Sequence, residues 1–137
     1  MAMFLADDEV PVEVYCSGTA FNPKLRAAGD VDAGVVVLRF ASGIIACIDN
    51  HRNACYGYDQ RAEVHTSEGA FSVENVFENT VVRAGSAGQV RQNPPPGLQR
   101  YEEAYKADIV HFSNLLLGLE SVPLSAAEDC VWTARIA

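Results

Sequence analysis

The sequence predicts an α+β fold: an open antiparallel or mixed sheet of five or six strands, with helices packed on one face and an oligomer interface on the other. Three observations favour it. Apolar and polar side chains alternate with a period of two over much of residues 12–83, as in half-buried strands. One strand pair is apolar on both faces, and after residue 97 the period becomes helical. The 137 residues are enough for one domain with a core, so we expect residues 1–137 to form one domain.

The alternation locates the strands. Val31–Phe40 is the strongest candidate, and the turn at Ala41–Gly43 joins it to Ile44–Ile48 as a hairpin. The other predicted strands are Val12–Gly18, Gln60–Thr66, Ala70–Val73 and Thr80–Arg83. Gly85–Gly97 is rich in Gly, Gln and Pro, and its prolines predict a loop because they cannot donate to a ladder of hydrogen bonds.

The central hairpin predicts an oligomer. Val35–Leu38 and Ile44–Ile48 carry apolar side chains on both faces, so both faces must be covered. Helices of the same chain can cover one face. The other face then requires a second subunit or another domain.

Helical patterns begin after the proline-rich loop. Apolar side chains three or four residues apart predict a long helix over Leu98–Leu117, which Gly118 can cap. Ser125–Glu128 fits a capping box that starts a second helix, which continues to Ala137 without a stop signal. Met3–Leu5 has the character of the end of a helix, so we expect both ends of the chain to be cuts.

Composition excludes several classes of function. The net charge of −8 and a pI near 4.7 argue against nucleic acid as a partner, because phosphate binding needs clustered Lys and Arg. No apolar run approaches the roughly 20 residues that span a bilayer, and no signal peptide is visible, so we expect no membrane partner. The four cysteines lack close pairing and three lie in apolar surroundings. We interpret them as reduced, buried thiols of a cytoplasmic protein, with a disulfide or metal framework as the alternative.

The densest polar group predicts a binding site for a hydroxyl-rich ligand. Asp49–Asn53 directly follows the buried strand, and Tyr56–Arg61 leads into the next one. Such ligands need many hydrogen-bond partners held on a rigid edge. The alternative is a structural loop whose Asp and Arg side chains pair and whose tyrosines cover the edge of a core.

Catalytic patterns are missing from the sequence. His51, His65 and His111 lie in three different predicted elements, and there is no HExxH metal motif or nucleophile signature. No GxGxxG stands between a strand and a helix. We therefore predict no catalytic, cofactor-binding or metal-binding residues, and no cofactor bound by this chain alone.

Four segments resemble the inositol dehydrogenase branch of the Gfo/Idh/MocA oxidoreductases. They are Asp30–Phe40, Ile48–Arg52, Tyr56–Val64 and Arg100–Tyr105, and the string Tyr56–Arg61 is the most specific. The resemblance covers nearly the whole chain. It implies a two-domain enzyme that moves a hydride between NAD or NADP and a secondary alcohol of an inositol or related sugar.

In that family a Rossmann domain precedes an α+β domain whose open sheet packs on a partner subunit. The family's catalytic Lys, Asp and His lie before the point that corresponds to Met1, so the resemblance implies that this chain is catalytically incomplete. It is expected to be the C-terminal substrate-binding and oligomerisation domain, a homo-oligomer through its sheet face.

Carried over residue by residue, the resemblance assigns substrate-lining roles to Tyr58, Tyr56, Asn50 and Arg52. Asp49 and Asp59 are expected to brace the loop, and the role of His51 stays open. Two alternatives remain: a non-catalytic interaction module that pairs through its sheet face with another chain, and a fragment with no function of its own.

Overall fold

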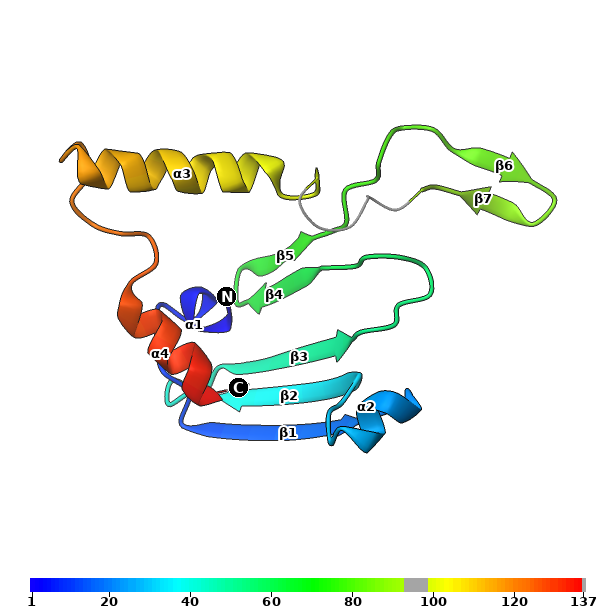
Figure 1. The fold of residues 1–137 in the computed structure, drawn as a ribbon, viewed down its shortest axis with the longest axis horizontal. Helices are drawn as coiled ribbons and strands as arrows, with labels where there is room; N and C mark the ends of the chain where they lie inside the picture. The colour runs from blue at the N-terminus through cyan, green and yellow to red at the C-terminus, as the bar shows by residue number, and fades with distance from the viewer. Residues whose placement is uncertain (93–98, 137) are drawn as a thin grey trace. The chain divides into compact units, whose positions relative to one another are not determined.

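The computed structural model describes residues 1–92 and 99–136, which form two compact units (Figure 1). One unit consists of Met1–Asn53 and Leu124–Ala137, and the other of Ala54–Pro123.

The first unit is built on a three-stranded antiparallel sheet. Its strands β1 (Glu13–Thr19), β2 (Ala33–Arg39) and β3 (Ile45–His51) lie in the order β1-β2-β3, and the short helix α2 (Pro23–Ala27) connects the first two. Val14, Leu38 and Ala46 lie opposite one another across the three strands. The predicted hairpin is confirmed, with the amide of Phe40 donating to the carbonyl of Ile44 at 2.9 Å.

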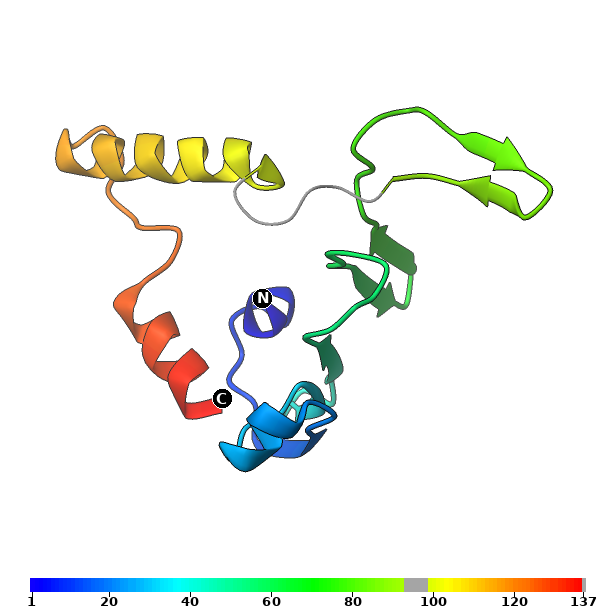
Figure 2. The same cartoon turned by 45° about the vertical axis from the view of Figure 1, so that its right-hand side comes forward.

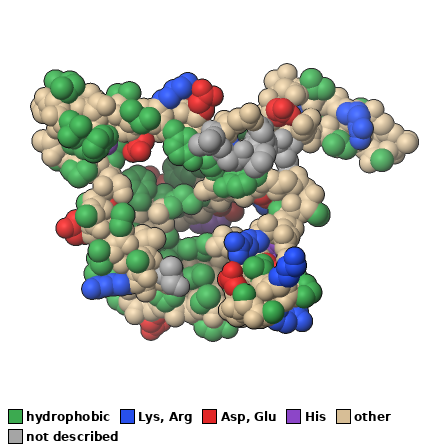
Figure 3. All heavy atoms as spheres, in the orientation of Figure 1, with side chains coloured by type: hydrophobic (Ala, Val, Ile, Leu, Met, Phe, Trp, Pro, Cys, Tyr) green, Lys and Arg blue, Asp and Glu red, His purple; other side chains and the backbone are tan. Residues whose placement is uncertain are grey.

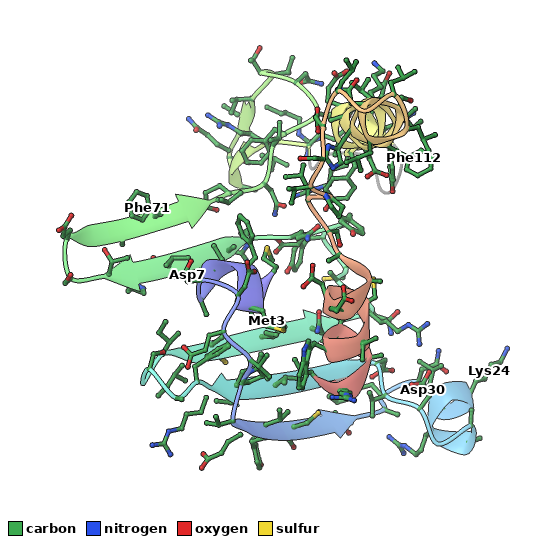
Figure 4. All side chains as sticks on the ribbon, turned by 90° about the vertical axis from the view of Figure 1, so that its left-hand side faces the viewer. Met3, Asp7, Lys24, Asp30, Phe71 and Phe112 are labelled. Carbon is green, nitrogen blue, oxygen red and sulfur yellow. The ribbon has the colours of Figure 1, made fainter. Side chains whose placement is uncertain are left out.

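Helices cover one face of this sheet. Leu38 and Phe40 are 2% and 1% exposed, and together with Ala6 they form the core. α1 (Ala2–Leu5) and α4 (Ala127–Ile136) lie over that face, and Met3 points from α1 toward the sheet (Figures 1 and 4). The prediction of helices on one face is confirmed for this unit.

No described residue of the unit packs over the opposite face. The pairing register places Tyr15, Val37 and Cys47 in one row there, with Val35 and Ile45 beside them. Tyr15 is 65% and Ile45 68% exposed. We call these five residues the open sheet face.

The second unit contains two hairpins and one helix. β4 (Ala62–Thr66) pairs with β5 (Gly69–Val73), and β6 (Arg83–Gly85) pairs with β7 (Gly88–Val90) as a separate ribbon (Figure 2). Helix α3 (Glu102–Leu116) follows. It ends as predicted at Gly118, whose φ of 70° allows the amide of Leu119 to reach the carbonyl of Asn114 at 2.9 Å.

The amphipathic pattern predicted the helix α3, but the helix begins at Glu102 rather than at Leu98, which lies outside the described residues. The apolar side chains of its predicted face are not buried. Ile109, Phe112 and Leu116 are 66%, 61% and 73% exposed, and hydrophobic atoms cover much of the helix in Figure 3. Among the described residues, the hydrophobic side chains that are fully buried all lie in the first unit.

The strands do not form one sheet of five or six strands. Hydrogen bonds divide the described strands into three antiparallel sheets, β1-β2-β3, β4-β5 and β6-β7. Alternation reveals a strand but not its partner, which explains the difference.

Gly85–Gly97 is not wholly a loop. Gly88, with φ of 109°, permits the tight turn that pairs Gly88–Val90 with Arg83–Gly85. Thr80 lies before this strand rather than in it. The prolines Pro94–Pro96 lie outside the described residues.

Two smaller predictions need correction. The start of α4 lies one residue later than the capping box predicts, because the Asp129 carboxylate accepts from the amide of Ala126 at 2.8 Å. The cysteines are free, but all four are exposed rather than buried. β1 is exposed throughout, and Cys47 lies on the uncovered side of β3.

Leu38→Ala tests the importance of the one covered face. We expect it to lower the free energy of unfolding by about 2–5 kcal/mol, because it leaves a cavity beneath the helices. Leu116→Ala, the same change at a side chain 73% exposed, should alter it by less than about 0.5 kcal/mol. Urea denaturation measures both, and equal losses would contradict this location of the core.

Candidate functional site

The four predicted substrate residues divide between the two units. Asn50 and Arg52 lie at and just beyond the end of β3, and Tyr56 and Tyr58 lie in the segment that precedes β4.

Arg52 is held at two points. Its amide donates to the carbonyl of Asp32 at 2.8 Å, and its Nη1 donates to the Asp30 carboxylate at 3.1 Å. Both side chains of this ion pair are more than half exposed, so the guanidinium remains accessible. Asn50, also exposed, pairs in register with Gly34.

A buried carboxylate organises the backbone beside Arg52. Asp32 is 3% exposed and accepts from the amides of Phe21 and Asn22 at 2.9 and 2.7 Å. These two hydrogen bonds lower the pKa of Asp32. The ring of Phe21 stacks on His51, with centroids 6.3 Å apart, and the amide of Asn53 donates to His51 Nδ1 at 3.1 Å. Asp30 and Asp32 were not singled out from the sequence, although both lie in a segment that carries the resemblance.

Asp59 fixes the segment Tyr56–Arg61 by side-chain bonds. Its carboxylate accepts from Tyr56 Oη at 3.0 Å and from Arg61 Nε and Nη2 at 2.9 Å each, and it also pairs with Asn75. The Arg61 and Asn75 bonds lower the pKa of Asp59, while the carboxylate raises the pKa of Tyr56. Asp59 thus has the bracing contacts that the resemblance implied. The same Asp–Arg pairing agrees with the structural-loop alternative.

Tyr58 lies among aromatic and cationic neighbours. Its ring meets that of Tyr101 edge to face, with centroids 6.5 Å apart and planes at 78°. The Tyr101 phenol raises the pKa of Tyr58. The Arg100 guanidinium carbon lies 5.5 Å from the Tyr58 centroid. Tyr58 is 42% and Tyr56 59% exposed, so both rings retain accessible surface.

These groups suit hydrogen bonding to a neutral ligand. The phenols of one unit, and the amide and guanidinium of the other, are each well matched to hydroxyl groups. Both phenols are protonated at neutral pH, since a tyrosine pKa of 10.0 already lies above it and is raised further here. Within residues 1–92 and 99–136, no group of three His, Cys, Asp or Glu side chains is placed to hold a metal ion. In the same residues, no helix has the length and hydrophobicity needed to cross a bilayer.

The histidines serve separate local contacts. His65 lies 3.6 Å from Glu63, and His111 pairs with Glu120 just beyond the end of α3. Asn114 Nδ2 also donates to Glu120, at 2.8 Å, so this pair closes the helix end.

A family model matches residues 1–72, slightly more than half of the chain, and it describes the GFO/IDH/MocA C-terminal domain. The myo-inositol 2-dehydrogenase of Thermotoga maritima is 41% identical over 114 residues, which are 82% of this chain and 34% of that protein. The scyllo-inositol 2-dehydrogenase (NAD(+)) of Bacillus subtilis is 30% identical over 92 residues, 67% of the chain and 27% of that protein.

Solved structures agree with these relatives. The crystal structure of a myo-inositol dehydrogenase from Corynebacterium glutamicum has a TM-score of 0.76 and 31% identity, covering 83% of this chain and 34% of that one. The chain therefore spans about a third of the length of the inositol dehydrogenases that it matches.

The bracing role of Asp59 predicts two effects of Asp59→Asn. The pKa of Tyr56 should fall toward its ordinary value of 10.0, because the variant lacks the charge that opposes phenolate formation. Titration followed by ultraviolet absorbance measures this shift. Asp49→Asn, which leaves the contacts of Asp59 in place, is the control.

The second effect concerns stability against pH. The folded-state pKa of Asp59 lies below its ordinary 3.8, so its stabilisation is complete above pH 3.8 and is lost as the pH falls through the lowered value. Wild type should therefore exceed Asp59→Asn in stability at neutral pH and converge with it in strong acid. A difference in stability between the two proteins that persists below the folded-state pKa of Asp59 would show that the Asp59 charge is not its source.

Proposed function

Because this chain belongs to the GFO/IDH/MocA family, as a C-terminal domain, we propose that it forms the substrate-binding and oligomerisation part of an NAD(P)-dependent dehydrogenase of inositol or a related polyol. The observation that carries the proposal is the braced segment Tyr56–Arg61. It presents two phenols in a chain that is 41% identical to a myo-inositol 2-dehydrogenase.

The ligand-facing groups match the chemistry of a polyol. Each ring hydroxyl of such a ligand both donates and accepts a hydrogen bond, and so does each protonated phenol. Tyr58, Tyr56, Asn50 and Arg52 are proposed to line the substrate. Asp59 and Asp30 limit the motion of Tyr56 and Arg52, so less conformational entropy is lost when the ligand binds.

The chemical step is assigned to the rest of the enzyme. A Rossmann domain outside these residues would bind NAD or NADP and accept the hydride, and it would supply the catalytic Lys; the catalytic Asp and His would also come from outside this chain. The chain on its own is then a binding domain without turnover. NAD is favoured by the name of the Bacillus relative, and the free thiols are compatible with a reducing cytoplasm.

The open sheet face supports the oligomerisation role. Val35 and Ile45 are 39% and 68% exposed, although the other side of their strands packs into the core, and Tyr15 beside them on β1 is 65% exposed. Contiguous exposed apolar surface marks an interaction site, and a closed two-fold dimer would bury the same face on both subunits. We therefore assign this face to contact with a second copy.

The same face also favours the second candidate function, an interaction module that pairs with a different protein. That hypothesis requires a stable stoichiometric complex with another chain and no affinity for polyols. Calorimetry with myo-inositol separates the two functions.

Tyr58→Phe tests substrate binding. We expect the affinity for myo-inositol to fall about tenfold by isothermal titration calorimetry, the effect of one lost hydrogen bond of roughly 1.5 kcal/mol. Tyr15→Phe removes a hydroxyl from the open sheet face and should leave the affinity unchanged. Wild-type protein that binds no polyol would overturn the proposed function.

Ile45→Lys tests the interface. Wild type should sediment as a dimer or larger assembly, and the charge should convert it to monomer because a lysine cannot be buried unpaired against an apolar partner. Val81→Lys changes a side chain of the other unit that is also 68% exposed, and it should leave the assembly intact. A wild-type chain that is monomeric at high concentration would refute the assignment.

A further inference from the structure

We propose that Arg100 is a positioning residue for Tyr58: it fixes the phenol ring and the backbone that follows it. The consequence for substrate rests on the proposed function of Tyr58. The placement itself rests on contacts within the unit Ala54–Pro123.

The first contact is between the charge and the ring. The guanidinium carbon of Arg100 lies 5.5 Å from the centroid of Tyr58 and 5.6 Å from that of Tyr101. A cation at this distance is attracted to the electron-rich face of a tyrosine. Since the two rings also meet edge to face, Arg100 and Tyr101 restrict the Tyr58 ring together.

The second contact is with the backbone. Arg100 Nη2 donates to the carbonyl of Gln60 at 3.0 Å and to Asn75 Oδ1 at 2.7 Å. Asn75 Oδ1 also accepts from the amide of Gln60 at 3.0 Å, and its Nδ2 pairs with Asp59. One side chain therefore holds a position two residues after Tyr58 and joins the Asp59 network.

The segment needs such a restraint from outside. Gly57, immediately before Tyr58, has φ of 108°, a conformation that glycine adopts freely and that gives the backbone little local stiffness. Asp59 binds the hydroxyl of Tyr56 but has no bond to that of Tyr58 among the described contacts. Arg100 supplies the missing restraint from 40 residues along the chain.

The geometry requires arginine rather than a general cation. The planar guanidinium can stack on rings while its edge donates two bonds, which the compact ammonium of lysine cannot reproduce. Arg100 Nη1 is buried without a hydrogen-bond partner among the described residues. Burying this donor unpaired costs free energy, and the attraction of the charge to the two ring faces offsets part of that cost.

The test compares Arg100→Gln and Arg100→Lys with wild type by aromatic NMR, the Tyr58 signals being assigned with Tyr58→Phe. Arg100→Gln should shift and average these signals and raise the pKa of Tyr58, because the Arg100 charge lowers it. Arg100→Lys should keep most of the charge effect on the pKa and still lose ring order. The control Arg91→Gln removes a guanidinium that lies 5.1 Å from the Phe77 ring in the same unit, and it should leave Tyr58 unchanged.

The affinity for myo-inositol should fall about 3- to 10-fold in both Arg100 variants, the scale of one cation–π contact plus loss of pre-organisation. Asn75→Ala serves as a second variant that leaves the Arg100 charge in place, and it should weaken ring order in the same direction. Circular dichroism identifies variants that do not fold.

Unchanged Tyr58 signals in folded Arg100→Gln would overturn the positioning role, even if wild type binds myo-inositol. If the Tyr58 ring loses order in Arg100→Gln while wild-type protein binds no polyol, the positioning role is supported and the proposed function is overturned. The two failures are thus distinguishable.

Discussion

One-sided burial of β2 is the constraint on which the first unit depends. Leu38 and Phe40 are buried beneath α1 and α4, whereas Val35 on the other side of the strand is 39% exposed. A core of so few side chains gives small stability per residue, because little of the chain's apolar surface leaves water. The proposed interface and the core are therefore two sides of one strand, and a change in β2 acts on both.

The second unit is organised by polar contacts rather than by apolar burial. Asp59, Asn75 and Arg100 form a connected set of charge-assisted hydrogen bonds, and two tyrosines are attached to it. Such bonds have strict geometry, so they specify the orientation of the phenols better than apolar packing alone would. For a ligand covered with hydroxyls, orientation of the partners matters more than the area they bury.

The sequence revealed local features more reliably than long-range ones. The period of two located five strands to within a few residues, and the glycine after α3 marked its cap, because both signals depend on near neighbours. Sheet partners were not predictable, since pairing depends on chain segments that alternation does not compare. The strand β7, Gly88–Val90, gives no strand signal because Val90 is its one apolar β-branched residue. The sequence places Arg100 near a helix start, because no local pattern shows its contact with Gln60.

Cys47 lies in the same row of the open sheet face as Tyr15 and Val37, and its thiol is exposed. In the proposed oligomer, Cys47 would be shielded from an alkylating reagent that reaches it in a free chain. Cys16 lies opposite Val36 on the other side of the sheet and provides an internal reference. Under the proposed interface, Cys47 would serve as a native probe of assembly that needs no engineered label.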